Sequence, residues 1–401
     1  MQVDFNAVEA LEQELEPTML ARAHAAADKM IESKERGGRV AVVTGSGPNV
    51  HEGVTTLIAE LMRAGIIDAV TTSSAVVSHE MGGTLDKVKR CDGNAVGVDP
   101  FFLPRGGEFE LTDMPEERIQ ELAHHVPIDF GLIERLKQTP GKTIIKAAGN
   151  LGYPMGLWME HLAMEITTLA HAHGATFEEI AGLGADEHTM IGIGAQKGLP
   201  VLVTIPQLIG GGLVGLAIGD SVSITGRASR LAHMLDACDV IIESGVALTQ
   251  EIHDGPFERY TGHGLWSAWH GHFSYSLEGK TLIRIDLDPA LEQVYQAERE
   301  GSAVQQAIAD GLPKTKLFKV PFRMEMSGFA RHEGSIPVIG DLGVVWPIMA
   351  RRVAHRLGIE LDFMSYPQQT GPGRAMREAI VRDVQPVSRT KMLDALARTR
   401  D

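Results

Sequence analysis

The sequence predicts an α/β fold with a mostly parallel sheet covered by helices on both faces. Apolar stretches of strand length, many of them ending in glycine, alternate with stretches of helix length along most of the 401 residues. The strand-like stretches are almost continuously apolar, as strands are when both faces of their sheet are covered. Apolar residues make up 44% of the chain, which indicates a globular protein rather than a disordered one.

The first elements follow this alternation closely. Residues 4–35 have a helical pattern and end in basic residues and a glycine pair, the usual end of a helix. "RVAVVTG" at 39–45 is then expected as a buried strand, "GVTTLIAELMRAG" at 53–65 as a helix and "IIDAVTT" at 66–72 as the next strand. This order of strand, turn, helix and strand is typical of a parallel sheet.

The alternation breaks at 90–142, where we expect a loop and an acidic helix, and then resumes. A long loop is expected at 249–276 and a helix-rich tail after residue 300. The predicted organisation is an N-terminal helical segment at 1–37, an α/β domain at 38–298 and a C-terminal extension at 299–401. The later strands are expected at 142–149, 200–205, 239–245 and 280–289, and the helices between them at 156–174 and 227–238.

Composition and charge exclude several classes of protein. The formal net charge of -15 argues against a general nucleic-acid binder. The two cysteines, Cys91 and Cys238, form no disulfide framework and no CxxC, which fits a reducing compartment. The acidic, amphipathic start at 1–20 is neither a secretory signal nor a transit peptide, so we expect a cytoplasmic protein.

One uncharged stretch, residues 199–219, is long enough to cross a membrane. Pro206 and Gln207 divide it into a strand-like piece and a glycine-rich piece, and it has neither a basic flank nor a second span beside it. We therefore expect no membrane association.

Glycine-bearing turns follow several of the predicted strands. Gly45, Ser46 and Gly47 lie between the first strand and its helix, where they could cradle a phosphate or could simply form a tight turn. Ligands of open parallel sheets bind beyond the carboxyl ends of the strands. Several such turns together favour nucleotide or dinucleotide binding.

A histidine-rich loop is the second candidate site. Metal binding, a substrate-binding or acid/base lid, and solvated loop histidines all remain open for it, and its glycines favour a mobile loop over a rigid metal cage. The loop holds His253, His263, His270 and His272, with Glu251, Asp254, Trp266 and Trp269 among them.

His79 and Glu80 follow the strand at 66–72 and form a candidate general acid/base pair. Neighbouring residues usually point in different directions, so the alternative is a helix start with Glu80 near its positive end. His51, at the mouth of the first strand, is a further candidate, and His188 a minor one.

Four stretches of the chain resemble the deoxyhypusine synthase-like NAD/FAD-binding superfamily. The resemblance covers roughly residues 38–295 and implies a Rossmann-like sheet, NAD as cofactor (or FAD), and a homotetramer with sites between subunits. The stretches are "GVTTLIAELMRAGIIDAVTTSSAVVSHE", "GAQKGLPVLVTIPQLIGGGLVG", "LDACDVIIESGVAL" and "LIRIDLDPALEQVY".

Residue by residue, the resemblance transfers only in part. Thr71 and Thr72 match the family's dinucleotide-contacting threonines, while its two acidic site residues fall on Val77 and Ser78. The family's lysine segment is missing from "LWSAWHGHF", so deoxyhypusine synthesis itself is not expected. The second family region is matched at Pro206, Leu208, Gly211 and Leu213.

"AVVSHE" at 75–80 also resembles a stretch of the archaeal-type ornithine cyclodeaminases. That resemblance implies an enzyme that oxidises an amine with bound NAD, loses or exchanges nitrogen and returns the hydride. The resulting hypothesis is an NAD-binding transferase, deaminase or lyase that acts at a C–N bond of a small amine or amino-acid-like molecule.

In this hypothesis His79 or His51 moves protons with help from Glu80, and the loop with His263 and His270 closes over the substrate. The residues expected to hold the dinucleotide are Gly45, Ser46, Gly47, Thr71, Thr72, Ser73, Gly211, Gly245 and Asp286. Two alternatives remain: a metal-dependent hydrolase or lyase that uses the His253–His272 loop, and a nucleotide-binding regulatory subunit without catalysis.

Overall fold

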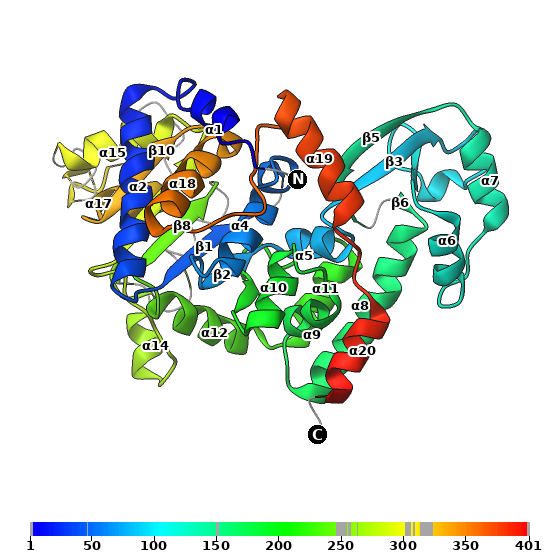
Figure 1. The fold of residues 1–401 in the computed structure, drawn as a ribbon. Coiled ribbons are helices and arrows are strands. Elements are labelled where there is room, and N and C mark those ends of the chain that lie inside the picture. Colours follow the sequence, from blue (N-terminus) through cyan, green and yellow to red (C-terminus); the bar gives the residue numbers. More distant parts are fainter. Residues whose placement is uncertain are drawn as a thin grey trace.

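The computed structural model describes residues 3–398 except 46, 150–151, 246–254, 256–257, 263, 301–305, 308 and 313–323. The described chain confirms the predicted α/β class, with a six-stranded parallel sheet, flanking helices and a helix-rich C-terminal region (Figure 1). A second sheet, of four strands, forms a separate lobe beside it.

The six-stranded sheet has the strand order of a Rossmann fold. Its order across the sheet is β7-β2-β1-β8-β9-β10, which in chain order reads 3-2-1-4-5-6, and every pair is parallel. The order reverses between β1 and β8, where such sheets bind their ligands. The strands are β1 (Val40–Thr44), β2 (Ala69–Thr72), β7 (Val201–Val203), β8 (Val240–Ser244), β9 (Thr281–Asp286) and β10 (Ser335–Ile339).

Helices cover both faces of this sheet. Successive side chains of its strands point to opposite sides, so each face has an apolar surface for helices to bury. On one face, Val42, Val70 and Ile242 pack with α2 (Pro17–Glu35), α4 (Val54–Arg63) and α18 (Leu342–Leu357). On the other face, the strands pack with α12 (Ile224–Asp236), α15 (Ala290–Arg299) and α17 (Met324–Arg331).

The stretch expected to be irregular, 90–142, instead belongs to the second sheet. Its order is β5-β3-β4-β6, and β5, which we expected in the parallel sheet, pairs antiparallel with β3. The lobe has a small core of its own around Leu111, Ile133 and Leu136. Its elements are β3 (Leu85–Asp92), β4 (Glu108–Thr112), α6 (Glu116–Ala123), α7 (Phe130–Gln138), β5 (Gly141–Ala147) and β6 (Gly152–Tyr153).

The C-terminal region contributes more than helices. β10 lies within it and forms one edge of the six-stranded sheet, so part of the expected extension completes that sheet. The other helices that the argument uses are α1 (Phe5–Leu11), α3 (Pro48–His51), α5 (Ser74–Met81), α8 (Met155–His173), α9 (Phe177–Gly184), α10 (Met190–Lys197), α11 (Leu213–Ser221), α14 (Leu265–Trp269), α19 (Gly371–Asp383) and α20 (Arg389–Arg398).

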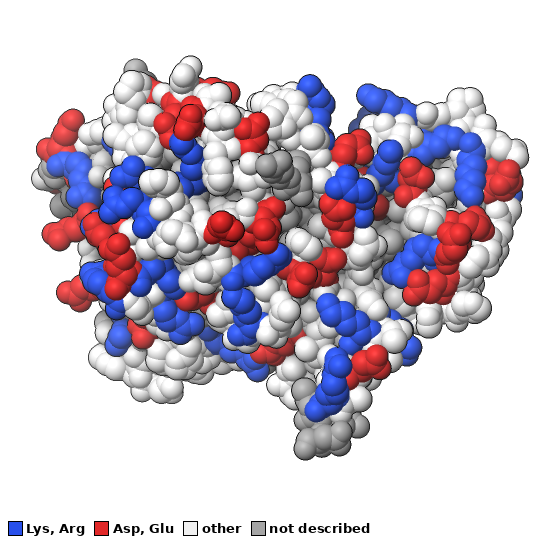
Figure 2. Space-filling view, viewed as in Figure 1, with Lys and Arg blue, Asp and Glu red and all other residues white. Residues whose placement is uncertain are grey.

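The uncharged stretch at 199–219 divides as expected, into β7 and most of α11. Among the helices that the structure describes, none is long and apolar enough to span a membrane. Figure 2 shows acidic and basic side chains interspersed on the face of the molecule that it draws.

Candidate active site

A small cavity between the two sheets brings ionisable side chains from separate elements together. It has a volume of about 110 Å³, and we call it the histidine cavity. Two of its residues follow strands of the parallel sheet, so it lies at the carboxyl edge where such sheets bind ligands. Its ionisable residues are His51 at the end of α3, His79 on α5, Asp86 on β3, Glu110 on β4 and Lys146 on β5.

The imidazole of His79 is oriented by the backbone of the second sheet. Its Nδ1 forms a hydrogen bond with the carbonyl oxygen of Ala148. Because a carbonyl can only accept, Nδ1 carries the hydrogen and Nε2 is left with a lone pair. Burial lowers the pKa of His79, and the nearby charges of His51 and Lys146 lower it further. His79 is therefore a neutral base at physiological pH.

His51 has the same electrostatic character. Burial lowers its pKa first, and the positive charges of Arg377 and Lys146 add to the effect. Arg377, on α19, donates to the carbonyl oxygen of Ile145 and so fixes this C-terminal helix to β5. The histidine cavity thus holds two imidazoles that favour the neutral form.

The acidic groups of the cavity differ from one another. Both oxygens of Glu110 accept from Nζ of Lys146, at 3.1 and 2.8 Å, so this carboxylate is neutralised by its partner. Burial raises the pKa of Asp86 to about 7, although Thr112 donates a hydrogen bond of 3.4 Å to it. Asp86 therefore changes charge near neutral pH, and perturbed groups of this kind cluster at functional sites.

The histidine cavity adjoins a larger cleft of about 850 Å³ that shares Glu110, Lys146 and Gly152 with it. Phe102 and Arg105 lie on the wall of this cleft. The larger cleft therefore borders the histidine cavity at the three shared residues.

Glu80 does not act on His79. Its two carboxylate oxygens accept the backbone N–H groups of Met190 and Ile191, at 2.9 and 3.0 Å, and so cap the start of α10. Burial raises the pKa of Glu80 to about 7. The third histidine named from the sequence, His188, pairs with Asp186 at 2.7 Å and does not line the histidine cavity.

Glycines at the ends of β1 and β8 flank the point where the strand order reverses. Gly47 has φ +67° and Gly245 has φ +102°, and among the described residues a Cβ at either position would meet nothing within 4 Å. Gly45, half-buried, follows β1 directly, whereas Ser46 lies outside the described residues. The two positive φ values lie at the switch point of the sheet, where Rossmann folds bind their ligands.

The hydroxyl residues after β2 fall into two groups. Thr71 and Thr72 are fully buried, and within the described part of the chain their hydroxyls have no hydrogen-bond partner. Buried polar groups are normally satisfied, so each hydroxyl is open to a partner, but Thr71 and Thr72 are successive strand residues and point to opposite faces of the sheet. Ser73 is already engaged, because its hydroxyl accepts the N–H of Val76 at 3.1 Å and caps α5.

Two further residues expected at the dinucleotide have local structural roles. Gly211 has φ +84°, and a Cβ there would lie 3.1 Å from both the carbonyl oxygen of Ser74 and Cβ of Ser78, so it permits close packing on α5. Asp286, at the buried end of β9, accepts the N–H of Asp288 at 2.9 Å and lies 3.4 Å from Arg284.

The histidine-rich loop is only partly described, since His253 and His263 lie outside the described residues. His270 follows α14, which lies at the end of the molecule away from the second sheet (Figure 1). It therefore does not join the histidine cavity. In the residues that the structure describes, no group of three or more His, Cys, Asp or Glu is arranged to hold a metal ion.

Sequence reasoning missed Asp86, Glu110 and Lys146. Each is a polar residue in a strand of the second sheet, and the strand β3 reads "LDKVKRCD", in which charged residues dominate. A lone lysine within the apolar run "TIIKAA" was the available signal, because an inward-facing charge in a strand calls for a partner.

No protein-family model and no curated protein sequence matches the chain. Among solved structures, a conserved LOR/SDH protein from Methanococcus maripaludis S2 is similar over 84% of this chain and 68% of its own, with 10% identity and a TM-score of 0.40. ArgZ, an arginine dihydrolase of the ornithine-ammonia cycle in cyanobacteria, is similar over 85% of this chain, with 12% identity and a TM-score of 0.37.

AgrE, solved as a ternary complex with ornithine and NAD⁺, is similar over 89% of this chain, with 12% identity and a TM-score of 0.37. The chain spans only 32% of the length of ArgZ and 34% of AgrE. Likeness at this level does not assign a function, so the function proposed below rests on the side chains of this chain.

Proposed function

We propose that the protein is an NAD-binding enzyme that acts at a C–N bond of a small amine or amino-acid-like substrate. One observation carries the proposal: two neutral histidines and a carboxyl group that titrates near pH 7 line a cavity at the carboxyl edge of a sheet in 3-2-1-4-5-6 order. Acid/base groups of this kind suit reactions in which an amine must lose and regain protons.

The dinucleotide would lie at the switch point, over Gly45, Gly47 and Gly245, with the buried hydroxyl of Thr71 or Thr72 as a further contact. When bound, its nicotinamide supplies reversible hydride transfer at the carbon that carries the substrate nitrogen. We keep NAD as the proposed cofactor because the strand order and the open glycines fit a dinucleotide.

The chain's own groups then handle protons and orientation. Nε2 of His79 is the group that we assign to take a proton from the substrate nitrogen, because burial lowers the pKa of this imidazole and so keeps it unprotonated. Asp86, once ionised, would attract the ammonium group of the substrate, and His51, which lines the same cavity, would return a proton.

The first test is whether the purified chain binds NAD⁺, measured by native mass spectrometry and by titration calorimetry. The second is a screen of small amines and amino acids for ammonia release with NAD⁺ present. We expect stoichiometric NAD⁺ binding and turnover of at least one substrate class. A chain that binds no dinucleotide contradicts the proposal, and binding without any turnover favours the regulatory alternative.

Native mass spectrometry also tests the proposed homotetramer. The exposed aromatic pair Trp266 and Trp269 on α14, whose ring centroids are 4.4 Å apart, is a surface that subunit contacts could cover. A monomer at micromolar concentration would remove the tetramer from the proposal without affecting the histidine cavity.

A further inference from the structure

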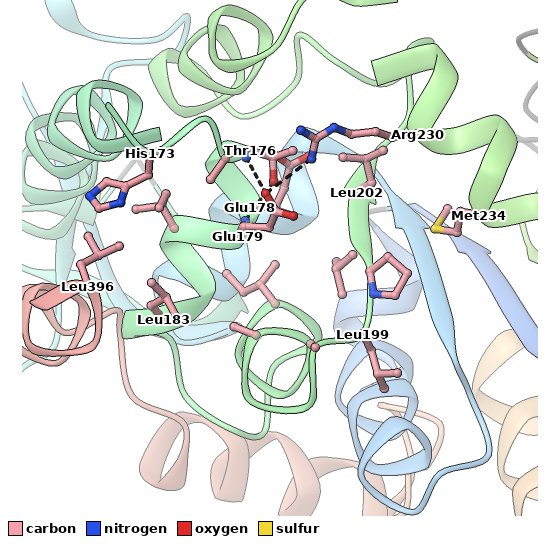
Figure 3. A pocket seen from close by; sticks show the side chains of 18 residues that line it. His173, Thr176, Glu178, Glu179, Leu183, Leu199, Leu202, Arg230, Met234 and Leu396 are labelled. Atoms are coloured by element: carbon pink, nitrogen blue, oxygen red, sulfur yellow. Dashed lines mark hydrogen bonds and ion pairs between the residues drawn. The ribbon is translucent and has the colours of Figure 1, made fainter. Parts of the chain in front are cut away.

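A second pocket, of about 450 Å³, lies along the free edge of β7, away from the histidine cavity (Figure 3). We call it the edge pocket. Its walls come from α9, α10, α12 and α20, and most are apolar, including Ile180, Leu183, Ile191 and Leu396. Its volume and lining are typical of sites for small molecules.

The hydrogen bonds of β7 show which backbone groups face this pocket. Val70 donates to the carbonyl oxygen of Pro200 at 2.9 Å, and Thr204 donates to that of Thr72 at 2.8 Å. Since backbone groups alternate in direction along a strand, residues 200, 202 and 204 face β2. Val201 and Val203 therefore present their N–H and C=O groups to the opposite side, where the edge pocket lies.

Val203 is satisfied by side chains. Its N–H donates to Glu178 at 2.7 Å, and its carbonyl accepts from Arg227 at 3.3 Å. Glu178 and Arg227 form an ion pair of 2.5 Å, and both side chains are fully buried. This pair blocks the strand edge at Val203, so an additional β-strand cannot extend along β7.

Val201 is different. Within the described part of the chain no group forms a hydrogen bond with its N–H or C=O, although the residue is only 8% exposed. Buried backbone groups are nearly always paired, so this pair is available to a ligand. In an extended residue the N–H and C=O point the same way and match a molecule with an adjacent acceptor and donor.

The rim of the edge pocket adds charge of both signs. Arg230 and Glu179 lie 3.6 Å apart and are 43% and 56% exposed, so water screens their attraction. Glu179 is held by the N–H of Thr176 at 2.6 Å, whereas Arg230 can turn to a ligand. Thus the pocket combines an apolar wall, one donor and acceptor pair at its floor, and a cation and an anion at its rim.

We propose that the edge pocket is a regulatory site for an apolar α-amino acid. The carboxylate accepts the N–H of Val201 and reaches Arg230, while the ammonium group donates to the carbonyl of Val201. The side chain packs among Leu183, Ile191 and Leu396. A zwitterion with an apolar side chain matches the floor, the rim and the wall together.

A ligand in the edge pocket would affect the histidine cavity through α10. This step rests on the proposed function. Ile191 lines the pocket, and its N–H and that of Met190 are held by Glu80. Glu80 is the chain neighbour of His79 on α5. A ligand that moves α10 therefore moves the helix that carries His79, and we expect it to change the rate of catalysis.

The test is calorimetric titration of the whole chain, saturated with NAD⁺, with L-leucine. We expect leucine to bind, and 4-methylpentanoate (no ammonium) and 3-methylbutylamine (no carboxylate) to bind at least about tenfold more weakly. Arg230→Ala should weaken leucine binding about tenfold, whereas Arg356→Ala, an exposed arginine on α18, serves as the matched control. Leu183→Trp should abolish binding by filling the pocket.

NAD⁺ affinity is measured for every variant and reports that each one is folded. Absence of leucine and phenylalanine binding by a chain that binds NAD⁺ overturns the proposal, as does equal binding of 4-methylpentanoate. Equal loss in Arg230→Ala and Arg356→Ala also overturns it. Leucine binding by a chain that neither binds NAD⁺ nor turns over amines would instead remove the proposed function and leave the edge pocket standing.

Discussion

The histidine cavity and the edge pocket lie at different edges of the same parallel sheet and differ in where their polar groups come from. In the histidine cavity, ionisable side chains converge from both sheets, and burial moves the pKa values of His51, His79 and Asp86. In the edge pocket, the floor is the backbone of Val201 and the charges are solvated at the rim. The first arrangement is suited to proton transfer and the second to binding.

The carboxyl groups of Glu80 and Asp86, both close to His79 or the histidine cavity, have different partners. Burial raises the pKa values of Glu80 and Asp86 alike, to about 7. Glu80 is engaged by two backbone N–H groups of α10, whereas Asp86 faces the cavity. A perturbed pKa therefore indicates a functional group only when the group also faces open space.

The largest expected effect is on catalysis. His79→Ala should lower kcat/KM about 10²–10⁴-fold, the usual contribution of a positioned general base, with little change in NAD⁺ affinity. Steady-state kinetics on the substrate found in the amine screen measures it, with His355→Ala, an exposed histidine on α18, as the control. Equal kcat/KM in the two variants would show that the histidine cavity is not the reaction site.

The next effect is on folding. Glu80→Ala should lower the free energy of unfolding by about 2–4 kcal/mol, because two buried N–H groups of α10 lose their acceptor and a cavity forms. Urea denaturation measures it. If Glu80 were mainly a catalytic partner of His79, the unfolding midpoint would hardly move and kcat/KM would fall as far as in His79→Ala.

Asp86 should give a pH dependence. Its folded pKa, about 7, lies above the unfolded value of 3.8, so the native state binds the extra proton between these values. The contribution of Asp86 to the free energy of unfolding is thus fully present below about pH 4 and is lost as pH rises through 7, by an amount on the order of 4 kcal/mol. Asp86→Asn should flatten this part of the curve of unfolding free energy against pH.

Activity supplies the matching test for Asp86. If ionised Asp86 attracts the substrate ammonium, kcat/KM rises through pH 7 in the wild type, and Asp86→Asn removes that rise. A rise that survives the substitution assigns the titration to another group.

The smallest effects come from a matched pair of glycines with positive φ. Gly211→Ala should destabilise by about 1–2 kcal/mol because its Cβ would press on Ser74 and Ser78, and it should leave NAD⁺ affinity unchanged. Gly47→Ala has open space and should cost about 1 kcal/mol from backbone strain alone. Gly47→Ala should also weaken NAD⁺ binding, as titration calorimetry would show. If Gly211→Ala weakened NAD⁺ binding and Gly47→Ala did not, the dinucleotide would lie elsewhere.

The sequence predicts part of the fold well for a clear physical reason. β1, β2, β8 and β9 are short, carry buried apolar residues at neighbouring positions and are followed by glycine or polar turns, which is the pattern of buried parallel strands. The second sheet escaped prediction because the apolar residues of β3, Leu85, Val88 and Cys91, stand three apart instead of alternating with polar ones, and its partners are distant in sequence. β10 escaped because it is a lone strand among helices, and only its pairing with β9 places it in the sheet.

Some residues of the candidate site could likewise be predicted from the sequence and others could not. The sequence by itself determined that His51 and His79 follow buried strands, and parallel strands carry such residues to one edge. It also placed Glu80 beside His79, but consecutive residues on a helix point about 100° apart, so the two serve different partners.

Only the tertiary structure decided that Asp86, Glu110 and Lys146 join the two histidines and that no described residue pairs with the N–H and C=O of Val201. Each of these depends on contacts between segments far apart in the chain. The four-stranded sheet packs beside the six-stranded one, and β7 is an edge strand of the six-stranded sheet. Local sequence patterns specify which residues are buried in a strand or helix, whereas the packing of separate elements specifies which charges meet.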